Sequence, residues 1–360
     1  MFGFLSKNKG PFTATVQPTG QQITIKGGSS ENLLKAALEN GINWPYNCRV
    51  GSCGTCKCKL VSGKIKPLND FSYVLTKEEM DAGYILACQT MLKSDIEVEV
   101  AIEAAQNGVA VAKARRIQGA ISRAEPLTHD ILEVAIELDG KLNDYMPGQY
   151  ADIVIPGIAD EPRSYSFSKS PAKENPNEVS FFIRRVPKGK LTEWLHSGNH
   201  VGQRVEVDGP HGSFYLRKGS GPIVLVAGGS GLAPIRALLH QIVEEKLDND
   251  VTLIFGARTR QGLYCLDEIN AISRETKGKF SFLPVLSAEG PGEGWTGATG
   301  MCPDVITPAM LDAGESKAYL CGPPLMVDAA CARLKAAGVA DGQIFFDKFL
   351  DASTMPNGRR

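Results

Sequence analysis

The sequence predicts a multidomain chain in which a small α+β domain is followed by an antiparallel β domain and then by a doubly wound α/β domain. Three observations indicate this fold class. The 360 residues exceed one ordinary domain, which spans roughly 100–200 residues. Apolar runs change along the chain from mixed strands and helix, to strands alone, to strands that alternate with helices. Five of the nine cysteines lie in the first quarter of the chain.

Composition and charge exclude several classes of protein. Hydrophobic residues make up 43% of the chain and charged residues 22%, which is typical of a globular protein rather than a disordered one. The 39 basic and 40 acidic residues nearly cancel, so we expect no nucleic-acid partner. No apolar run approaches the ~18–20 residues of a membrane helix. The N-terminus lacks the apolar core of a secretory signal, so we expect a cytoplasmic protein with reduced cysteines.

The first domain is expected over residues 1–103. A helix is predicted over residues 31–40, where apolar residues recur at helical spacing before Gly41. Residues 104–113 are small and weakly patterned, which is typical of a linker. The other expected elements of this domain are a hairpin over 13–26, strands Lys57–Val61 and Asp95–Val100, and a short helix Thr76–Asp81.

The second domain is expected over residues 114–217. Its short strands are separated by turn signals, which predicts an antiparallel barrel or sandwich. One helical segment, Leu191–His196, interrupts the strands. The expected strands are Arg116–Ser122, Ile131–Leu138, Tyr150–Ile155, Arg163–Ser168, Val179–Val186 and Arg204–Asp208.

The third domain is expected over residues 218–350, with a C-terminal tail at 351–360. The fully apolar run Ile223–Ala227 indicates a buried parallel strand. Strands and helices then alternate, which predicts a doubly wound parallel sheet. The other expected strands are Val251–Gly256, Phe280–Leu286, Lys317–Cys321 and Gln343–Phe349, and the expected helices are Pro234–Glu245, Leu266–Arg274 and Met326–Ala337.

Four cysteines have the spacing of an iron–sulfur site. Cys48-x4-Cys53-x2-Cys56 is followed after 31 residues by Cys88, which is the plant-type [2Fe–2S] arrangement. The loop must curl tightly for its thiolates to converge, and its two glycines, Gly51 and Gly54, permit this. Cys58 lies on the following predicted strand, outside the loop.

Two other interpretations of these cysteines compete. A zinc site would usually show two Cys pairs or Cys/His pairs, and no histidine occurs in the first 128 residues. A redox dithiol at Cys53 and Cys56 would need neither Cys48 nor Cys88.

The segment from about Thr15 to Val100 resembles the plant-type ferredoxin family. That resemblance implies a β-grasp domain in which the four cysteines hold a [2Fe–2S] cluster.

Two short motifs lie in the second domain. Residues 163–166 read Arg-Ser-Tyr-Ser, and residues 189–192, Gly-Lys-Leu-Thr, open a helix whose free backbone N–H groups favour an anion. By itself the first motif also fits an ordinary barrel strand. Together they resemble the FAD-binding domain of the ferredoxin–NADP reductase superfamily, although Lys188 stands where that family usually has glycine.

The resemblance implies a role for each residue of these motifs. Arg163 would pair with the FAD pyrophosphate, Tyr165 would pack on the isoalloxazine ring, and Ser166 would lie near flavin N5. The helix start would hold the other side of the pyrophosphate, through Gly189, Lys190, Leu191 and Thr192.

Two further segments indicate a nicotinamide dinucleotide. The predicted strand Ile223–Ala227 runs into Gly228-Gly229-Ser230-Gly231 and a helix, a setting in which backbone can approach a pyrophosphate. This is not the G-x-G-x-x-G fingerprint, and glycine turns are common in α/β proteins. Cys321-Gly322-Pro323 resembles the C-terminal motif of the same superfamily, which implies that Cys321 lies near nicotinamide C4. Its alternative role is that of a buried small side chain, which we also assign to Cys265, Cys302 and Cys331.

The choice between NADH and NADPH depends on the loop after the second strand of the third domain. Arg258 or Arg260 could bind a ribose 2′-phosphate, or could be solvated loop charges. Members of the superfamily that use NADH often carry an acidic residue nearby, where this chain has Gln261-Gly262. We expect NADH, with NADPH as the alternative.

The order of the three domains resembles the reductase components of bacterial multicomponent oxygenases. That resemblance implies an NADH-dependent reductase in which electrons pass from NADH to FAD, to the [2Fe–2S] cluster and to a protein acceptor, an oxygenase or hydroxylase component or a ferredoxin. FAD must stand between a two-electron donor and a one-electron cluster. Tyr165, Ser166 and Cys321 are the residues expected beside the reacting rings.

Other functions use the same domains. They are a reductase for a dehydrated nucleotide-sugar intermediate, a quinone reductase subunit and a non-enzymatic [2Fe–2S] redox sensor.

The segment around the cysteine loop is a candidate surface for binding the protein acceptor. No acidic residue lies between Cys48 and Pro67, so this segment either docks on an acidic partner or is a solvated rim. Its basic residues are Arg49, Lys57, Lys59, Lys64 and Lys66.

Overall fold

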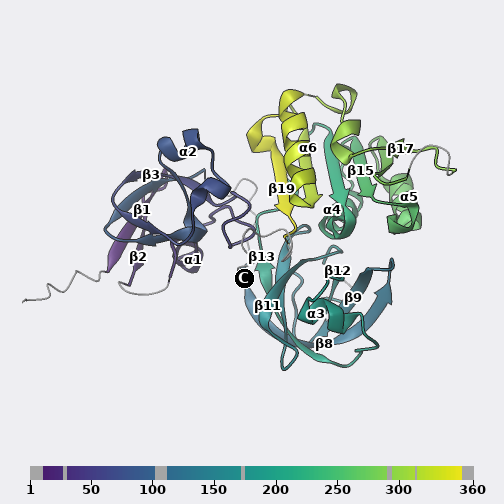
Figure 1. Ribbon diagram of the computed structural model, residues 1–360, viewed down its shortest axis with the longest axis horizontal. Coiled ribbons are helices and arrows are strands. Elements are labelled where there is room, and N and C mark those ends of the chain that lie inside the picture. Colours follow the sequence, from purple (N-terminus) through teal and green to yellow (C-terminus); the bar gives the residue numbers. More distant parts are fainter. Residues whose placement is uncertain are drawn as a thin grey trace, which may run out of the picture. The chain divides into compact units, whose positions relative to one another are not determined.

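The structure is a computed structural model that describes residues 11–26, 31–101, 112–171, 175–289, 294–312 and 314–350. The chain divides into an N-terminal unit, Met1–Val111, and a C-terminal unit, Ala112–Arg360. Most of the predicted linker and the predicted tail, 351–360, lie outside the described residues. Figure 1 shows both units and labels many of their helices and strands.

The N-terminal unit contains a mixed five-stranded sheet in the order β2-β1-β7-β3-β5. Strand β1 pairs antiparallel with β2 and parallel with β7. Helix α1 (Leu33–Glu39) buries its leucines and alanines in the core, and the Asn32 side chain caps its first turn. The strands are β1 (Phe12–Gln17), β2 (Gln21–Ile25), β3 (Lys57–Ser62), β5 (Tyr84–Leu86) and β7 (Ile96–Glu99).

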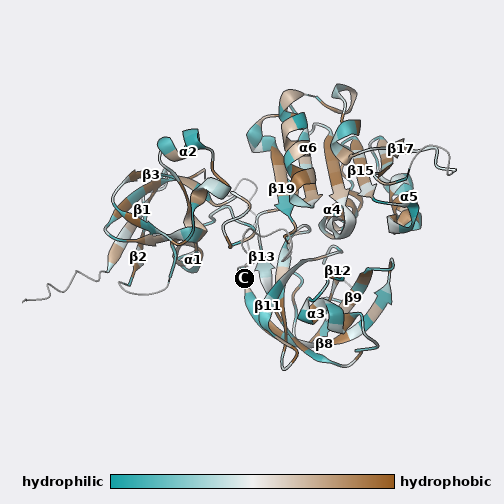
Figure 2. Cartoon of the chain, viewed as in Figure 1, coloured by the Kyte–Doolittle hydropathy of each residue, from teal (hydrophilic) through white to brown (hydrophobic). Residues whose placement is uncertain are grey.

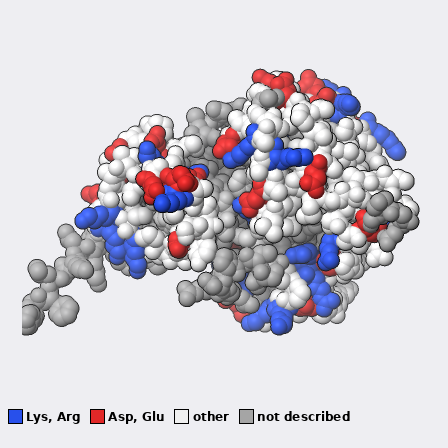
Figure 3. Space-filling model, turned by 45° about the horizontal axis from the view of Figure 1, so that its top comes forward, with Lys and Arg blue, Asp and Glu red and all other residues white. Residues whose placement is uncertain are grey.

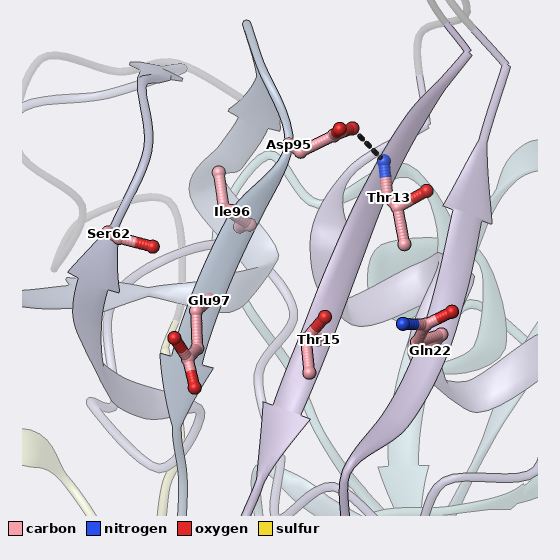
Figure 4. Close-up of a pocket in the computed structure, with 7 residues that line it drawn as sticks. All are labelled: Thr13, Thr15, Gln22, Ser62, Asp95, Ile96 and Glu97. Atoms are coloured by element: carbon pink, nitrogen blue, oxygen red, sulfur yellow. Dashed lines mark hydrogen bonds between the residues drawn. The ribbon is translucent and has the colours of Figure 1, made fainter.

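Two small features complete this unit. Helix α2 (Lys77–Asp81) begins with a capping box between Thr76 and Glu79. Strands β4 (Ile65–Pro67) and β6 (Thr90–Leu92) pair with each other. A groove of about 420 Å³ lies along the sheet, and Figure 4 shows its mostly polar lining from β1, β2, β3 and the start of β7. The groove contains none of the cysteines.

The C-terminal unit begins with an antiparallel sheet in the order β11-β10-β13-β8-β9-β12. An isolated bridge between Phe167 and Phe181 joins the two edges of this sheet, so the arrangement is a barrel rather than a sandwich. Helix α3 (Lys190–Leu195) follows β12. The strands are β8 (Arg115–Pro126), β9 (Ile131–Leu138), β10 (Tyr150–Ile155), β11 (Ala159–Ser166), β12 (Glu178–Arg184) and β13 (Arg204–His211).

A parallel sheet in the order β17-β16-β15-β14-β18-β19 forms the rest of this unit. Every residue of β14 (Ile223–Gly228) is buried, as the apolar run predicts. In Figure 2 strand β15 is largely brown and helix α5 largely teal, as expected for a covered sheet. The other elements are β15 (Val251–Ala257), β16 (Phe280–Leu286), β17 (Ala298–Thr299), β18 (Lys317–Gly322), β19 (Ile344–Lys348), α4 (Leu232–Glu244), α5 (Leu266–Glu275) and α6 (Pro324–Ala336).

The barrel and the parallel sheet share apolar packing within the C-terminal unit. Ile131, Phe182 and Phe214 from the barrel belong to the same buried cluster as residues of α4, β14 and β15. The two parts are therefore packed through a common core. The fold class predicted from the sequence is confirmed: a β-grasp domain, an antiparallel barrel and a doubly wound α/β domain.

Candidate cofactor sites

The structure brings the four predicted cysteines together as two pairs, Cys48 with Cys53 and Cys56 with Cys88. A hydrogen bond from the Cys53 thiol lowers the pKa of Cys48, and one from Cys56 lowers the pKa of Cys88. The pKa values of the donating thiols, Cys53 and Cys56, are raised by the same bonds and by burial. Among the described residues, no three metal-binding side chains are arranged so that they could hold one metal ion. Two pairs fit the two irons of a [2Fe–2S] cluster better than one zinc ion.

The backbone of the cysteine loop curls as its glycines predict. Gly51 and Gly54 have φ angles of +81° and +79°, and Arg49 also adopts the left-handed region at +56°. A Cβ atom on Gly51 would lie 2.5 Å from Cγ of Gln89. The backbone N–H of Ser52 donates to Sγ of Cys48 at 3.4 Å. The loop is thus closed tightly around its own sulfurs.

Gln89 braces this loop from the segment that carries Cys88. Its amide nitrogen Nε2 lies 3.5 Å from the carbonyl oxygen of Arg49 and 3.7 Å from Sγ of Cys88. Its carbonyl oxygen Oε1 accepts a hydrogen bond from Asn69 at 2.8 Å. Sequence reasoning assigned no role to Gln89, because its contacts join residues 40 positions apart.

Two buried hydroxyl groups test whether the loop fits a cluster. Among the described residues, Ser52 Oγ and Thr55 Oγ1 have no hydrogen-bond partner of normal geometry. They nevertheless lie close enough to sulfur to act on it: Ser52 contributes to the lowered pKa of Cys48, and Thr55 partly opposes the rise in the pKa of Cys53. Unsatisfied donors beside sulfur fit an anionic cluster that accepts their hydrogen bonds. Cys58 instead packs in the apolar core of the unit, 1% exposed.

Strand β11 carries the Arg-Ser-Tyr-Ser segment at one edge of the barrel sheet. Its pairing with β10 sets Arg163 opposite Ile153 and Tyr165 opposite Ala151, so these two side chains share a face. The Arg163 guanidinium bonds Glu161 at 3.0 Å. Ser166 faces the other way and is buried.

The turn before α3 brings its glycine and threonine into contact. A Cβ atom on Gly189 would lie 2.6 Å from Thr192 Oγ1, and that hydroxyl accepts a hydrogen bond from the Val186 N–H at 3.0 Å. Lys188 has a φ of +64°, the conformation that favours glycine. The backbone N–H groups of Lys190 and Leu191 lie in the first turn of α3, where N–H groups have no acceptor within the helix.

The two nicotinamide segments pack backbone to backbone. A Cβ atom on Gly231 would lie 2.3 Å from the carbonyl oxygen of Cys321, and one on Gly322 would lie 3.1 Å from backbone atoms of Gly228. Gly229 has a φ of +55°. Only glycine allows so close an approach. The glycines at 228–231 and 322 thus allow the two segments to pack directly against each other.

Ser166, Cys321 and Asp347 meet where β11, β18 and β19 end. The Ser166 hydroxyl donates to Oδ2 of Asp347 at 3.5 Å, and Cys321 is the strand partner of Asp347. Burial, and then the Asp347 carboxylate, raise the pKa of the Cys321 thiol well above its ordinary range, so the thiol is neutral. Sequence reasoning missed Asp347, because it lies 181 positions from Ser166 in a strand without a motif.

The two arginines of the loop after β15 have different surroundings. Arg258 is exposed, but Arg260 is held by Glu289 in the loop after β16. The Arg260 N–H donates to Oε1 of Glu289 at 2.8 Å, and its Nε donates to Oε2 at 2.9 Å. The Glu289 side chain is only 13% exposed. Sequence reasoning looked for an acidic residue in the loop after β15 alone and therefore missed Glu289.

The fold and these sites define an electron-transfer flavoprotein with its own ferredoxin domain. Three family models match, namely the 2Fe-2S iron-sulfur cluster binding domain at residues 16–93, the oxidoreductase FAD-binding domain at 118–215 and the oxidoreductase NAD-binding domain at 225–332. The chain belongs to the family of ferredoxin-, FAD- and NAD-binding reductases that act as electron-transfer components of multicomponent oxygenases.

Known proteins of this family are similar over nearly the whole chain. The xylene/toluene monooxygenase electron transfer component of Pseudomonas putida is 38% identical over 339 residues, with 94% of each chain covered. The propane 2-monooxygenase reductase component of Gordonia sp. (strain TY-5) is 35% identical, with 91% of this chain and 94% of the relative covered. The crystal structure of an Amycolatopsis cytochrome P450 reductase matches with a TM-score of 0.76 at 31% identity, covering 94% of this chain and 98% of that one.

These findings confirm the predicted cofactors. The chain is an oxidoreductase that binds a [2Fe–2S] cluster, FAD and NAD(H). Within the part of the chain that the structure describes, no helix has the length and apolar character needed to span a bilayer.

Proposed function

We propose that the chain oxidises NADH and passes the electrons one at a time to an oxygenase component. Its relatives are named as electron-transfer or reductase components of xylene, propane and naphthalene oxygenase systems. The observation that carries the proposal is the presence of two thiol pairs, a barrel and a glycine-lined dinucleotide surface in one chain. We assign the ferredoxin, FAD and nicotinamide domains to residues 1–103, 114–217 and 218–350, with 104–113 as the linker.

When bound, FAD accepts hydride from nicotinamide C4 at its N5 atom and releases electrons singly to the iron–sulfur cluster. The chain's own residues position these groups. Arg163 and the α3 turn, with Thr192, bind the FAD pyrophosphate, and Tyr165 packs on the flavin ring. In the turn at 228–231, a Cβ atom on Gly229 would have no atom within 4 Å, so this glycine would leave room for the nicotinamide pyrophosphate.

The reacting end is formed by Ser166, Cys321 and Asp347. The neutral Cys321 thiol places no charge where the nicotinamide ring enters, so it shapes the site through packing. The Ser166 hydroxyl is oriented by its hydrogen bond to the Asp347 carboxylate, so this pair would position the reacting edge of the flavin for hydride transfer.

The experiment that tests this proposal is NADH-driven reduction of the purified chain, with FAD and iron quantified. We expect one FAD and about two irons per chain, with repeated turnover when the oxygenase component is added. Stoichiometric reduction without turnover would instead support a redox sensor.

Glu289 supports a preference for NADH over NADPH. Its carboxylate lies beside Arg260, close to the ends of β15 and β16, where it would face a ribose 2′-phosphate. We expect Glu289→Gln to raise the ratio of kcat/KM for NADPH to that for NADH by about tenfold, because a like-charge contact is lost and Arg260 is released. The matched control, Glu275→Gln on the exposed end of α5, should leave the ratio unchanged. An unchanged ratio in Glu289→Gln would remove this assignment.

The basic rim of the ferredoxin domain is proposed to dock on an acidic partner surface. Lys57 is paired with Glu79, which leaves Lys59, Lys64 and Lys66 as its exposed lysines. Figure 3 shows basic and acidic side chains interspersed on the face that it displays. We expect the rate of partner reduction to fall about tenfold from low to high salt. The dependence should flatten in a Lys59→Gln, Lys64→Gln, Lys66→Gln variant, and a flat wild-type profile would contradict docking by charge.

A further inference from the structure

A buried ion cluster joins the barrel to the nucleotide-binding domain. Arg236 on α4 has a side chain that is only 8% exposed, and its NH1 group donates to Oε1 of Glu133 at 3.0 Å. Its Nε lies 2.8 Å from Oε2 of Glu268 on α5. Glu133 belongs to barrel strand β9. The guanidinium therefore connects one carboxylate of the barrel with one of its own domain.

Burying this arginine has a cost that apolar packing would avoid. Removing charges from water costs several kcal/mol for each ion, and an ion pair seldom recovers more than that. Burial opposes ionisation of Glu133, yet Arg236 holds its pKa below the ordinary value. Both groups thus stay charged although their side chains are about nine-tenths buried, with Lys169 and Arg123 as further basic neighbours of Glu133. Such pairs are best explained by the geometry that they impose, because charge pairing is directional and apolar packing is not.

The cluster lies next to the dinucleotide turn. Helix α4 begins directly after residues 228–231, and the Tyr264 hydroxyl donates to the carbonyl oxygen of Gly229 at 2.9 Å. The Tyr264 ring meets Phe182 of strand β12 edge-on, with centroids 5.5 Å apart. The Arg236 guanidinium lies 5.1 Å from the centroid of the same Phe182 ring. The turn and the arginine therefore contact one strand of the barrel.

We propose that the Glu133–Arg236 ion pair is a positioning device that sets the orientation of the nucleotide-binding domain against the FAD barrel, and so the approach of nicotinamide C4 to flavin N5. This inference rests on the proposed function. In this proposal Arg236 acts through α4 and the turn that precedes it, and not by contact with the nicotinamide or the flavin. A displacement of about 1 Å in a reacting pair costs about 100-fold in rate, so a small rotation at this joint is enough to slow hydride transfer.

The test compares full-length, cofactor-loaded variants by anaerobic stopped flow. Arg236→Met keeps the bulk of the side chain but removes its charge. We expect flavin bleaching by NADH to slow about 100-fold, with the Kd for NADH changing much less. Arg236→Lys should recover part of the rate. The matched control is Arg123→Met, because Arg123 pairs with the same Glu133 at 3.5 Å but lies on barrel strand β8, so that pair does not cross the joint.

A second readout does not depend on turnover. Hydrogen–deuterium exchange should rise in β9, β12 and α4 of Arg236→Met, and not in Arg123→Met. If Arg236→Met does not fold, Glu133→Gln removes the same charge pair and should show the same slow bleaching. Normal bleaching in a folded Arg236→Met or Glu133→Gln variant would overturn the inference. Absence of NADH-driven bleaching in the wild type would instead overturn the proposed function.

Discussion

A Cys88→Ala variant should lose reduction of its protein acceptor while NADH continues to bleach the flavin. Cys88 lies in one of the two thiol pairs, is 1% exposed and donates its backbone N–H to Sγ of Cys56 at 3.5 Å. Losing even an outer-shell partner costs about 10–100-fold in metal affinity or activity. Loss of a ligand should therefore remove the cluster, and acceptor reduction should fall by more than about 100-fold.

The measurement separates the two halves of the reaction. Iron content and the visible spectrum report the cluster, cytochrome c reduction reports electron exit, and anaerobic flavin bleaching reports hydride transfer. Cys58→Ala is the matched control, because Cys58 is an equally buried cysteine of the same unit that belongs to neither pair. A Cys88→Ala protein that keeps two irons, or that loses flavin bleaching although FAD is bound, would contradict this division of labour.

Regular elements and local motifs could be predicted because their signals are contained within a few residues. The strand limits Ile131–Leu138, Tyr150–Ile155 and Phe280–Leu286 agree with the structure, since each is a continuous apolar or alternating run. Strands β4, β5 and β6 have three residues each, which is too short for alternation to be visible. These strands form because the tertiary fold places a partner strand beside each of them.

The site residues that sequence reasoning missed share a different property. Asp347, Gln89 and Glu289 each make a contact with a residue far away in the chain, 181 positions for Asp347, 40 for Gln89 and 29 for Glu289. A carboxylate or amide in a strand end or loop has no periodic signature of its own. Arg236 looks like any polar residue of an amphipathic helix until Glu133, 103 positions earlier, is seen beside it.

Asp347→Ala should slow hydride transfer without disturbing the iron–sulfur cluster. Asp347 is 9% exposed, accepts from the Ser166 hydroxyl and is the strand partner of Cys321. A displacement of about 1 Å in a reacting pair costs about 100-fold in rate, so loss of the carboxylate that orients Ser166 should slow flavin bleaching by NADH by up to about that factor. Iron content, FAD content and acceptor reduction from chemically reduced protein should remain normal, because no cysteine of the two pairs is altered.

The matched control for this variant is Asp328→Ala. Asp328 lies on α6, pairs with Lys348 at 2.6 Å and is 57% exposed, so it is an acid beside β19 that is outside the reacting end. Ser166→Ala should slow bleaching as Asp347→Ala does, and the double variant should be scarcely slower than either, because residues that act as one unit are not additive. Full additivity of the two losses would show that Ser166 and Asp347 act separately, and an unchanged rate in Asp347→Ala would show that the carboxylate does not position the reacting groups.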